Sequence, residues 1–215
     1  MYGSFFNLMD NATKPLITNP PSPQMSNNSK PYQAMAIKRF GLDIPQTCIT
    51  SNPDEAKNFI STHKSVIYKS ISGYRSIVKK VTKKDIKQLG KIQYCPVQFQ
   101  ECVTGINIRV HVIGSKAIAT KINSDAVDYR YAGLESKHTE LDAFELRADI
   151  AEKCVGLAHH LKLPFSGIDL MLTNDGRTIC FEVNPCPGYS YYELSTGQPI
   201  SRFLAEYLHQ NSSFT

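Results

Sequence analysis

The sequence predicts an α+β fold made of two lobes. Helical and strand patterns fall into separate stretches, and the clearest strands turn back on themselves instead of alternating with helices. Two hairpins carry this prediction: INIRVHVIGSKAIATKI at 106–122 and GIDLMLTNDGRTICFEVNP at 167–185, both with alternating apolar residues. A chain of 215 residues is long enough for one sizeable core or two small ones.

The first lobe is expected over residues 30–95. Its first helix starts at Lys30 and stops at Gly41, because glycine readily adopts the left-handed conformation that ends helices. A second helix starts at Asn52, whose side chain can cap the free N–H groups of the first turn. The strand SVIYKSI follows, and Thr82 is expected to cap a short helix.

The second lobe is expected over residues 96–215 and contains both hairpins. VQFQECV is predicted to be its first strand. A helix from Asp142 to Leu163 is predicted between the hairpins, because apolar residues there recur at helical spacing. After the second hairpin, PCPGYSYYELSTG is expected to be a loop, and a short helix over 200–208 closes the lobe.

Composition excludes several classes of protein. The chain is 41% hydrophobic and 20% charged, without an apolar run of membrane-spanning length and without a signal-peptide pattern. The net charge of +5 suits an anionic small ligand and does not by itself indicate nucleic acid. We therefore expect no membrane and no nucleic-acid partner, and a homo-oligomer stays open. The six cysteines include no C-x-x-C pair, which favours buried free thiols in a reducing cytoplasm.

The hairpin at 167–185 carries polar residues that point to a metal. A two-residue turn at Asp175-Gly176 places Asp169 opposite Glu182, with Asn184 on the same face. Facing carboxylates repel, so they persist only if one is protonated or a cation lies between them. Carboxylate and amide oxygens suit Mg²⁺ or Mn²⁺. The alternative is the solvated polar face of an ordinary hairpin.

A magnesium site of this kind indicates a nucleotide. Mg²⁺ usually takes one or two carboxylates from the protein and completes its shell with water and phosphates. Lys69 and Arg109 stand in the middle of strands and are candidates to contact those phosphates, although each could also be an ordinary surface residue. Neither a P-loop nor a dinucleotide-binding glycine motif is present, which excludes those two nucleotide folds.

Seven motifs in a fixed order carry a family resemblance. They are Lys30, VIYK (66–69), FQECV (99–103), INIRV (106–110), VDYR (127–130), GIDL (167–170) and FEVNPCPGY (181–189). In this order the chain resembles the ATP-grasp superfamily over about residues 28–210. Within the superfamily it is similar to RimK-type glutamate ligases and to the ATP-grasp enzymes that cross-link microviridin-type peptides.

The resemblance implies an ATP-grasp fold with ATP bound between the two lobes. The residues implied to bind ATP are Lys30, Lys69, Glu101, Cys102, Val103 and Asn107. The implied ligands for Mg²⁺ (or Mn²⁺) are Asp169, Glu182 and Asn184. Arg109 would face the phosphates or the acyl intermediate, and Arg130 would lie near the acceptor. Asn107 stands where the family has an acidic residue, so its contact with ribose or adenine is expected to differ.

The reaction implied is ligation driven by ATP. A carboxylate attacks the γ-phosphate, an acylphosphate forms, and an amine or hydroxyl displaces the phosphate. The acceptor would be a peptide, a protein or an amino acid. The segment after Arg130, YAGLES, lacks the Asn-x-His-x-Gly-Gly of the glutamate ligases, which favours the peptide-modifying branch.

Two alternatives remain, a small-molecule kinase of the polyol phosphate type and a non-catalytic ATP-binding remnant. The loop PGYSYYEL contains no basic residue, which disfavours a phosphate-bearing acceptor. Relatives carry an additional N-terminal domain, which we expect to be missing or truncated here. Residues 1–29, rich in Pro, Asn and Ser, are accordingly expected to be a linker or the remnant of that domain.

Overall fold

The computed structural model describes residues 2–11, 16–71, 78–124 and 139–212. The chain forms two compact units. Unit 1 comprises Met1–Ile44, Gly105–Asn123 and Glu140–Thr215, and unit 2 comprises Pro45–Thr104 and Ser124–Thr139. This division differs from the expected boundary at residue 95. The helix that starts at Lys30 belongs to unit 1, and the strand after Pro96 belongs to unit 2.

Unit 1 is built on a five-stranded sheet of order β7-β6-β5-β8-β9. The strands are β5 (Gly105–Ile113), β6 (Lys116–Ser124), β7 (Thr139–Phe144), β8 (Phe165–Thr173) and β9 (Thr178–Asn184). Strand β5 pairs antiparallel with β6 and β8, and β8 pairs antiparallel with β9. The antiparallel hairpins predicted from the alternating pattern are thus present, and both contribute to one sheet.

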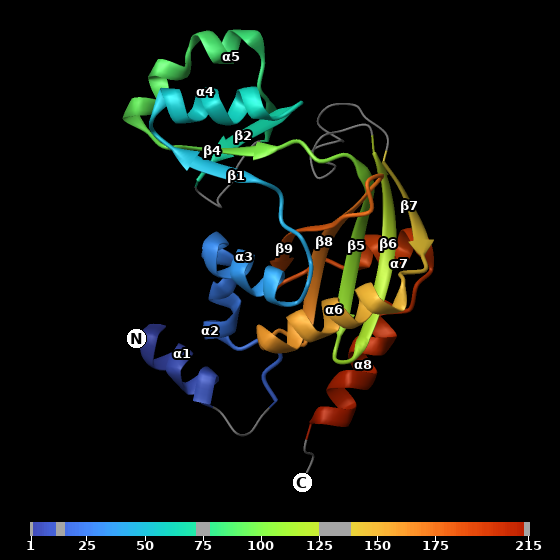
Figure 1. Ribbon diagram of the computed structural model, residues 1–215. Coiled ribbons are helices and arrows are strands. Elements are labelled where there is room, and N and C mark those ends of the chain that lie inside the picture. Colours follow the sequence, from blue (N-terminus) through green and yellow to red (C-terminus); the bar gives the residue numbers. More distant parts are fainter. Residues whose placement is uncertain (1, 12–15, 72–77, 125–138, 213–215) are drawn as a thin grey trace. The chain divides into compact units, whose positions relative to one another are not determined.

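Helices cover one face of this sheet and form the larger core. They are α3 (Lys30–Arg39) and α6 (Ala148–His160), and Figure 1 shows α6 lying across the strands. Buried Ile108 and Val110 of β5, Ile168 of β8 and Leu157 of α6 meet in this core. Unit 1 also holds α1 (Tyr2–Asn11), α2 (Pro21–Gln24), the 3₁₀ helix η1 (Met25–Asn28), α7 (Ser190–Thr196) and α8 (Ile200–Asn211).

Part of residues 1–29, which were expected to be a linker, packs against the sheet of unit 1. Asn19 is buried, and its side-chain amide donates to the carbonyls of Phe165 and Pro185, the latter at 2.6 Å. Its Oδ1 accepts the backbone N–H of Phe165 at 3.2 Å. One side chain therefore joins this stretch to both ends of the β8–β9 hairpin.

Unit 2 carries a four-stranded sheet of order β1-β4-β2-β3. The strands are β1 (Thr47–Thr50), β2 (Val66–Ser70), β3 (Lys79–Lys80) and β4 (Val97–Glu101). Helices α4 (Pro53–Thr62) and α5 (Lys83–Lys87) and the 3₁₀ helix η2 (Leu89–Tyr94) complete the unit. Asn52 caps α4 as predicted, and Thr82 caps α5 in a capping box with Asp85.

Two predictions about unit 1 were wrong. The helix expected from Asp142 begins only at Ala148, because residues 142–144 belong to β7 at the edge of the sheet and 145–147 connect the two elements. The loop expected after the second hairpin contains α7. Across the described residues, no helix combines the length and the apolar character needed to span a membrane.

The β8–β9 hairpin aligns Asp169 with Glu182 as predicted, but its loop and strand pairing differ from the prediction. Its loop has three residues between Thr173 and Arg177, with Gly176 at φ 84°, instead of two. The longer loop shifts the pairing by one residue, so Leu172 faces Thr178. A bulge between Asp169 and Leu170 shifts it back, so Asp169 faces Glu182 as predicted. The bulge also puts Cys180 into the core opposite Leu170.

Candidate functional site

The face of the unit 1 sheet opposite its core carries an ion pair between two strands. Arg109 of β5 lies directly across from Asp169 of β8, and its Nη1 donates to Oδ1 of Asp169 at 2.6 Å. The two side chains are 6% and 15% exposed. A charged pair so well shielded from water holds a single geometry, because either charge alone would be costly to bury.

Gly167 makes room for this arginine. A Cβ atom built on Gly167 would lie 2.7 Å from Nε of Arg109, and closer still to Cζ and Nη2. Side-chain carbons do not approach heavy atoms to within 3.0 Å. The first residue of the G-x-D motif is therefore glycine because the guanidinium lies over its backbone.

The second carboxylate is paired from the other side. Lys30, the first residue of α3, donates from Nζ to Oε2 of Glu182 at 2.8 Å and to Oδ1 of Asn27 at 3.1 Å. These side chains are more accessible, with Lys30 36% and Glu182 23% exposed. The carboxylates of Asp169 and Glu182, which face each other across β8 and β9, are therefore each bonded to a basic side chain.

The structure adds a further way to compensate the charges of the facing carboxylates. The sequence suggested that they need a shared proton or a cation between them. In the structure, the positive charges of Arg109 and Lys30 compensate them. The four side chains form a row in the order Arg109, Asp169, Glu182 and Lys30, with two negative charges between two positive ones. Like charges directly opposite are tolerable when each has a closer opposite charge.

The donor set fits a magnesium ion. Asn184 follows Glu182 by two residues on β9, and its Oδ1 accepts the backbone N–H of Cys186 at 2.9 Å. The described part of the chain contains no cluster of three or more His, Cys, Asp and Glu side chains suited to a metal. Two carboxylates and one amide oxygen nevertheless suffice for Mg²⁺, which keeps water and phosphate oxygens as its other ligands.

Sequence reasoning missed the role of His111. It lies two residues beyond Arg109 on the same strand and is completely buried. Its Nε2 lies 3.2 Å from the carbonyl of Gly188, and its ring meets that of Tyr192 edge-on at 4.9 Å. Burial, and next the charge of Arg109, lower the pKa of His111 from 6.5 to about 4. The only sequence signal was its alternation with Arg109.

The remaining predicted residues lie elsewhere. Lys69 is on β2 of unit 2, opposite Gln98 of β4. The backbone N–H groups of Glu101 and Cys102 donate at 2.9 Å to carbonyls within unit 2, so these two donors are already engaged. Asn107 lies on β5 and is half-buried. Arg130 falls outside the described residues.

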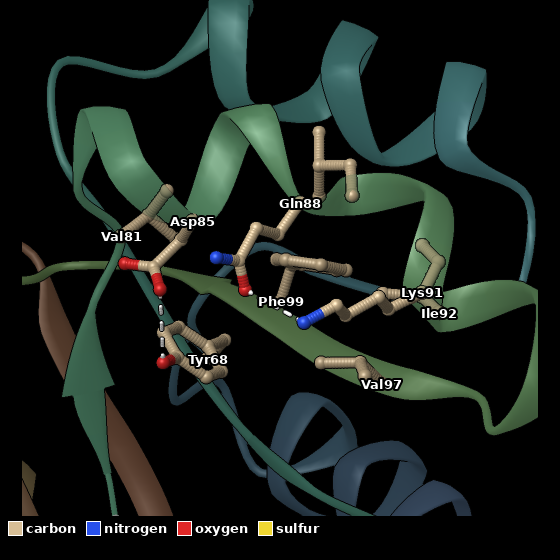
Figure 2. Close-up of a pocket in the computed structure, with 9 residues that line it drawn as sticks. Tyr68, Val81, Asp85, Gln88, Lys91, Ile92, Val97 and Phe99 are labelled. Carbon is tan, nitrogen blue, oxygen red and sulfur yellow. Dashed lines mark hydrogen bonds between the residues drawn. The ribbon is translucent and has the colours of Figure 1, made fainter.

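Unit 2 also contains a pocket of about 160 Å³ between its sheet and the segment from α5 to η2. Figure 2 shows the hydroxyl of Tyr68 donating to Asp85 at one end and Lys91 donating to Gln88 at the other. The other lining residues are Val81, Leu89, Ile92, Val97 and Phe99. None of the predicted site residues lines it. Lys69 follows Tyr68 in β2, and adjacent strand residues point to opposite faces of a sheet.

Comparison with known proteins shows the family of the chain. The chain matches the ATP-grasp domain family over residues 27–189. The probable α-L-glutamate ligase of Psychromonas ingrahamii is 27% identical over 185 residues, which is 81% of this chain and 61% of that protein. The corresponding protein of Coxiella burnetii is 27% identical over 187 residues, with 82% and 61% covered. The chain thus spans about three fifths of the length of these curated relatives.

Solved structures of two enzymes bound with precursors share the fold. The ATP-grasp ligase PsnB, complexed with a minimal precursor, superposes with a TM-score of 0.83 at 22% identity, covering 97% of this chain and 70% of that one. The macrocyclase MdnC of Microcystis aeruginosa, bound with precursor peptide MdnA, gives 0.82 at 25% identity, covering 98% and 69%. Both groups of relatives are those that the motifs indicated. Since the family match covers most of the chain and includes the GIDL and FEVNP motifs that form the ion-paired hairpin, the protein belongs to the ATP-grasp family.

Proposed function

We propose that the protein is an ATP- and magnesium-dependent ligase that activates a carboxylate as an acylphosphate and joins it to an amine or hydroxyl. The observation that carries this proposal is the row Arg109–Asp169–Glu182–Lys30 on one sheet face. Phosphoryl transfer needs positioned charge more than a protein nucleophile. The row supplies two cations and two carboxylates in a small area, which suits a polyphosphate with its metal.

Each group in unit 1 has a separate task in the proposed reaction. Asp169, Glu182 and Asn184 would hold Mg²⁺, which neutralises phosphate charge when bound. Arg109 is held rigidly by Asp169 and is proposed to orient an oxygen of the transferred phosphoryl group or of the acyl intermediate. Lys30, with its longer and more exposed side chain, is proposed to bind the phosphates.

The proposal also assigns roles to residues of unit 2 and to a residue near the acceptor. Lys69 and the segment Glu101–Val103 are proposed to contact the ATP, and Arg130 the acceptor side. A peptide or protein acceptor is favoured over a phosphate-bearing one because α7 exposes Tyr191 and Leu194 and contains no basic residue. The resemblance in fold to ligases crystallised with precursor peptides points the same way.

The test is the magnesium dependence of nucleotide binding. Replacing both carboxylates by alanine would remove the bond between the buried guanidinium of Arg109 and Asp169, so Asp169→Asn with Glu182→Gln is the better double variant. Its amide oxygens can still accept from Arg109 and Lys30. Isothermal titration of ATP, with and without Mg²⁺, should show that the parent gains affinity with the metal and the double variant does not.

The matched control lies on the same hairpin. Asp175→Asn removes one charge in the β8–β9 loop, where the carboxylate is exposed, and should keep the parental response to Mg²⁺. A double variant that still gains affinity with Mg²⁺ as the parent does would show that the metal binds elsewhere, and the proposed function would have lost its basis.

A further inference from the structure

Helix α3 is attached to the metal hairpin by one buried side chain. Gln33 donates from Nε2 to the carbonyl of Val183 at 2.7 Å and accepts the N–H of Val183 at Oε1 at 3.1 Å. It is 1% exposed. Its amide thus pairs with β9 as another strand would, at the residue between Glu182 and Asn184. The start of α3 is therefore positioned against the two proposed ligands on β9.

The two hydrogen bonds between Gln33 and Val183 explain why Lys30 contacts Glu182. Lys30 precedes Gln33 by three residues, so both side chains leave the same side of the helix. While Gln33 holds Val183, Lys30 is placed over the neighbouring Glu182 and bonds it at 2.8 Å. This contact joins residues 152 positions apart in the chain.

The two basic residues of the row differ in freedom. Arg109 is almost completely buried and wedged over Gly167, so it cannot leave Asp169 without disrupting the sheet face. Lys30 is more than a third exposed and sits at a helix end, on a flexible four-carbon stem. Of these two ion pairs, the Lys30–Glu182 pair is the one that can exchange its cation.

We propose that Lys30 is an exchangeable counter-cation that neutralises Glu182 until a divalent metal takes its place, and then moves to the nucleotide phosphates. The proposal rests on the proposed function, because it uses the same metal site. It predicts that Lys30 and the metal compete in the absence of nucleotide and cooperate in its presence. A lysine that serves only ATP would not compete with the metal.

The deciding measurement is Mn²⁺ binding to the nucleotide-free chain, followed by the electron paramagnetic resonance signal of free Mn²⁺. Lys30→Met removes the competing charge and should tighten Mn²⁺ binding by about three- to tenfold, since a unit charge a few ångströms from a divalent ion repels it appreciably even near water. The same variant should bind ADP and ATP more weakly than the parent at saturating Mn²⁺, because the lysine then contacts the phosphates only in the parent. Lys30→Arg should restore parental Mn²⁺ affinity.

Lys38→Met is the matched control. It makes the same change on the same helix at an exposed position two turns away, and should leave Mn²⁺ affinity close to parental. If Lys30→Met binds Mn²⁺ no more tightly than the parent, or if Lys38→Met has an equal effect, the exchange is refuted. Asp169→Asn with Glu182→Gln separates the two proposals. If that variant binds Mn²⁺ as the parent does, the metal site and the proposed function fail together.

Discussion

Gly167→Ala is predicted to break the Arg109–Asp169 pair without touching either residue. The new Cβ would force Nε of Arg109 to retreat from 2.7 Å to at least the ordinary contact distance of 3.4 Å, and the rest of the guanidinium further. A displacement of this size would stretch the bond to Asp169, now 2.6 Å long, and weaken or break it. Both side chains would remain charged and largely buried.

The expected cost follows from that burial. Removing one partner of a buried ion pair typically costs 3–5 kcal/mol, and displacing it should cost somewhat less, about 2–4 kcal/mol. Urea unfolding followed by circular dichroism measures this as a loss in the free energy of unfolding. Gly188→Ala is the control, because no heavy atom lies within 4 Å of its new Cβ, and it should change stability by less than about 0.5 kcal/mol.

A double-mutant cycle identifies the cause. In an Arg109→Ala background the clash is gone, so adding Gly167→Ala should cost less than about 1 kcal/mol. Equal costs in the two backgrounds would show that the glycine is needed for its backbone alone, and the explanation of the G-x-D motif given above would be refuted.

Three further outcomes are expected. Because the folded protein keeps His111 neutral down to about pH 4 while the unfolded chain takes up its proton near pH 6.5, stability should fall by about 3 kcal/mol as the pH drops through that window. Urea unfolding of His111→Gln should show a flatter pH profile, and an unchanged slope would contradict this. Ellman's reagent should react rapidly with exposed Cys95 and Cys186 and not with Cys154, since burial raises the pKa of that thiol to about 12. Fast labelling of a variant in which Cys48, Cys95, Cys102 and Cys186 are all replaced by serine would contradict this. Lys69→Ala should weaken ATP binding more than ADP binding if the lysine reaches the terminal phosphate. Equal losses of ATP and ADP affinity, measured by calorimetry, would indicate that Lys69 contacts the adenine end of the nucleotide instead.

The local pattern of the sequence predicted the strands and their faces well. Alternation at β5 and β8 put Arg109 and Asp169 on one face of their strands, because side-chain direction in a strand depends only on position. The capping residues Asn52 and Thr82 were recognisable for the same reason, since a cap needs only its own helix.

Other features depend on contacts that sequence spacing does not encode. The pairing of Lys30 with Glu182 arises from the docking of α3 on β9 through Gln33, and nothing in the isolated helix indicates that partner. Residues 142–144, where the helix was expected to start, instead end the edge strand β7, because β6 offers them backbone partners. His111 is buried because Tyr192 of α7, expected to be loop, covers its ring.

The bulge in the β8–β9 hairpin has a practical consequence for labelling. It separates the three-residue loop from the half of the hairpin that carries Asp169 and Glu182, and irregularities of this kind absorb changes of register. The loop is exposed, and Gly176 has open space around it. A fluorophore or short epitope attached at 174–176 would therefore report on the protein while the alignment of the two carboxylates is preserved.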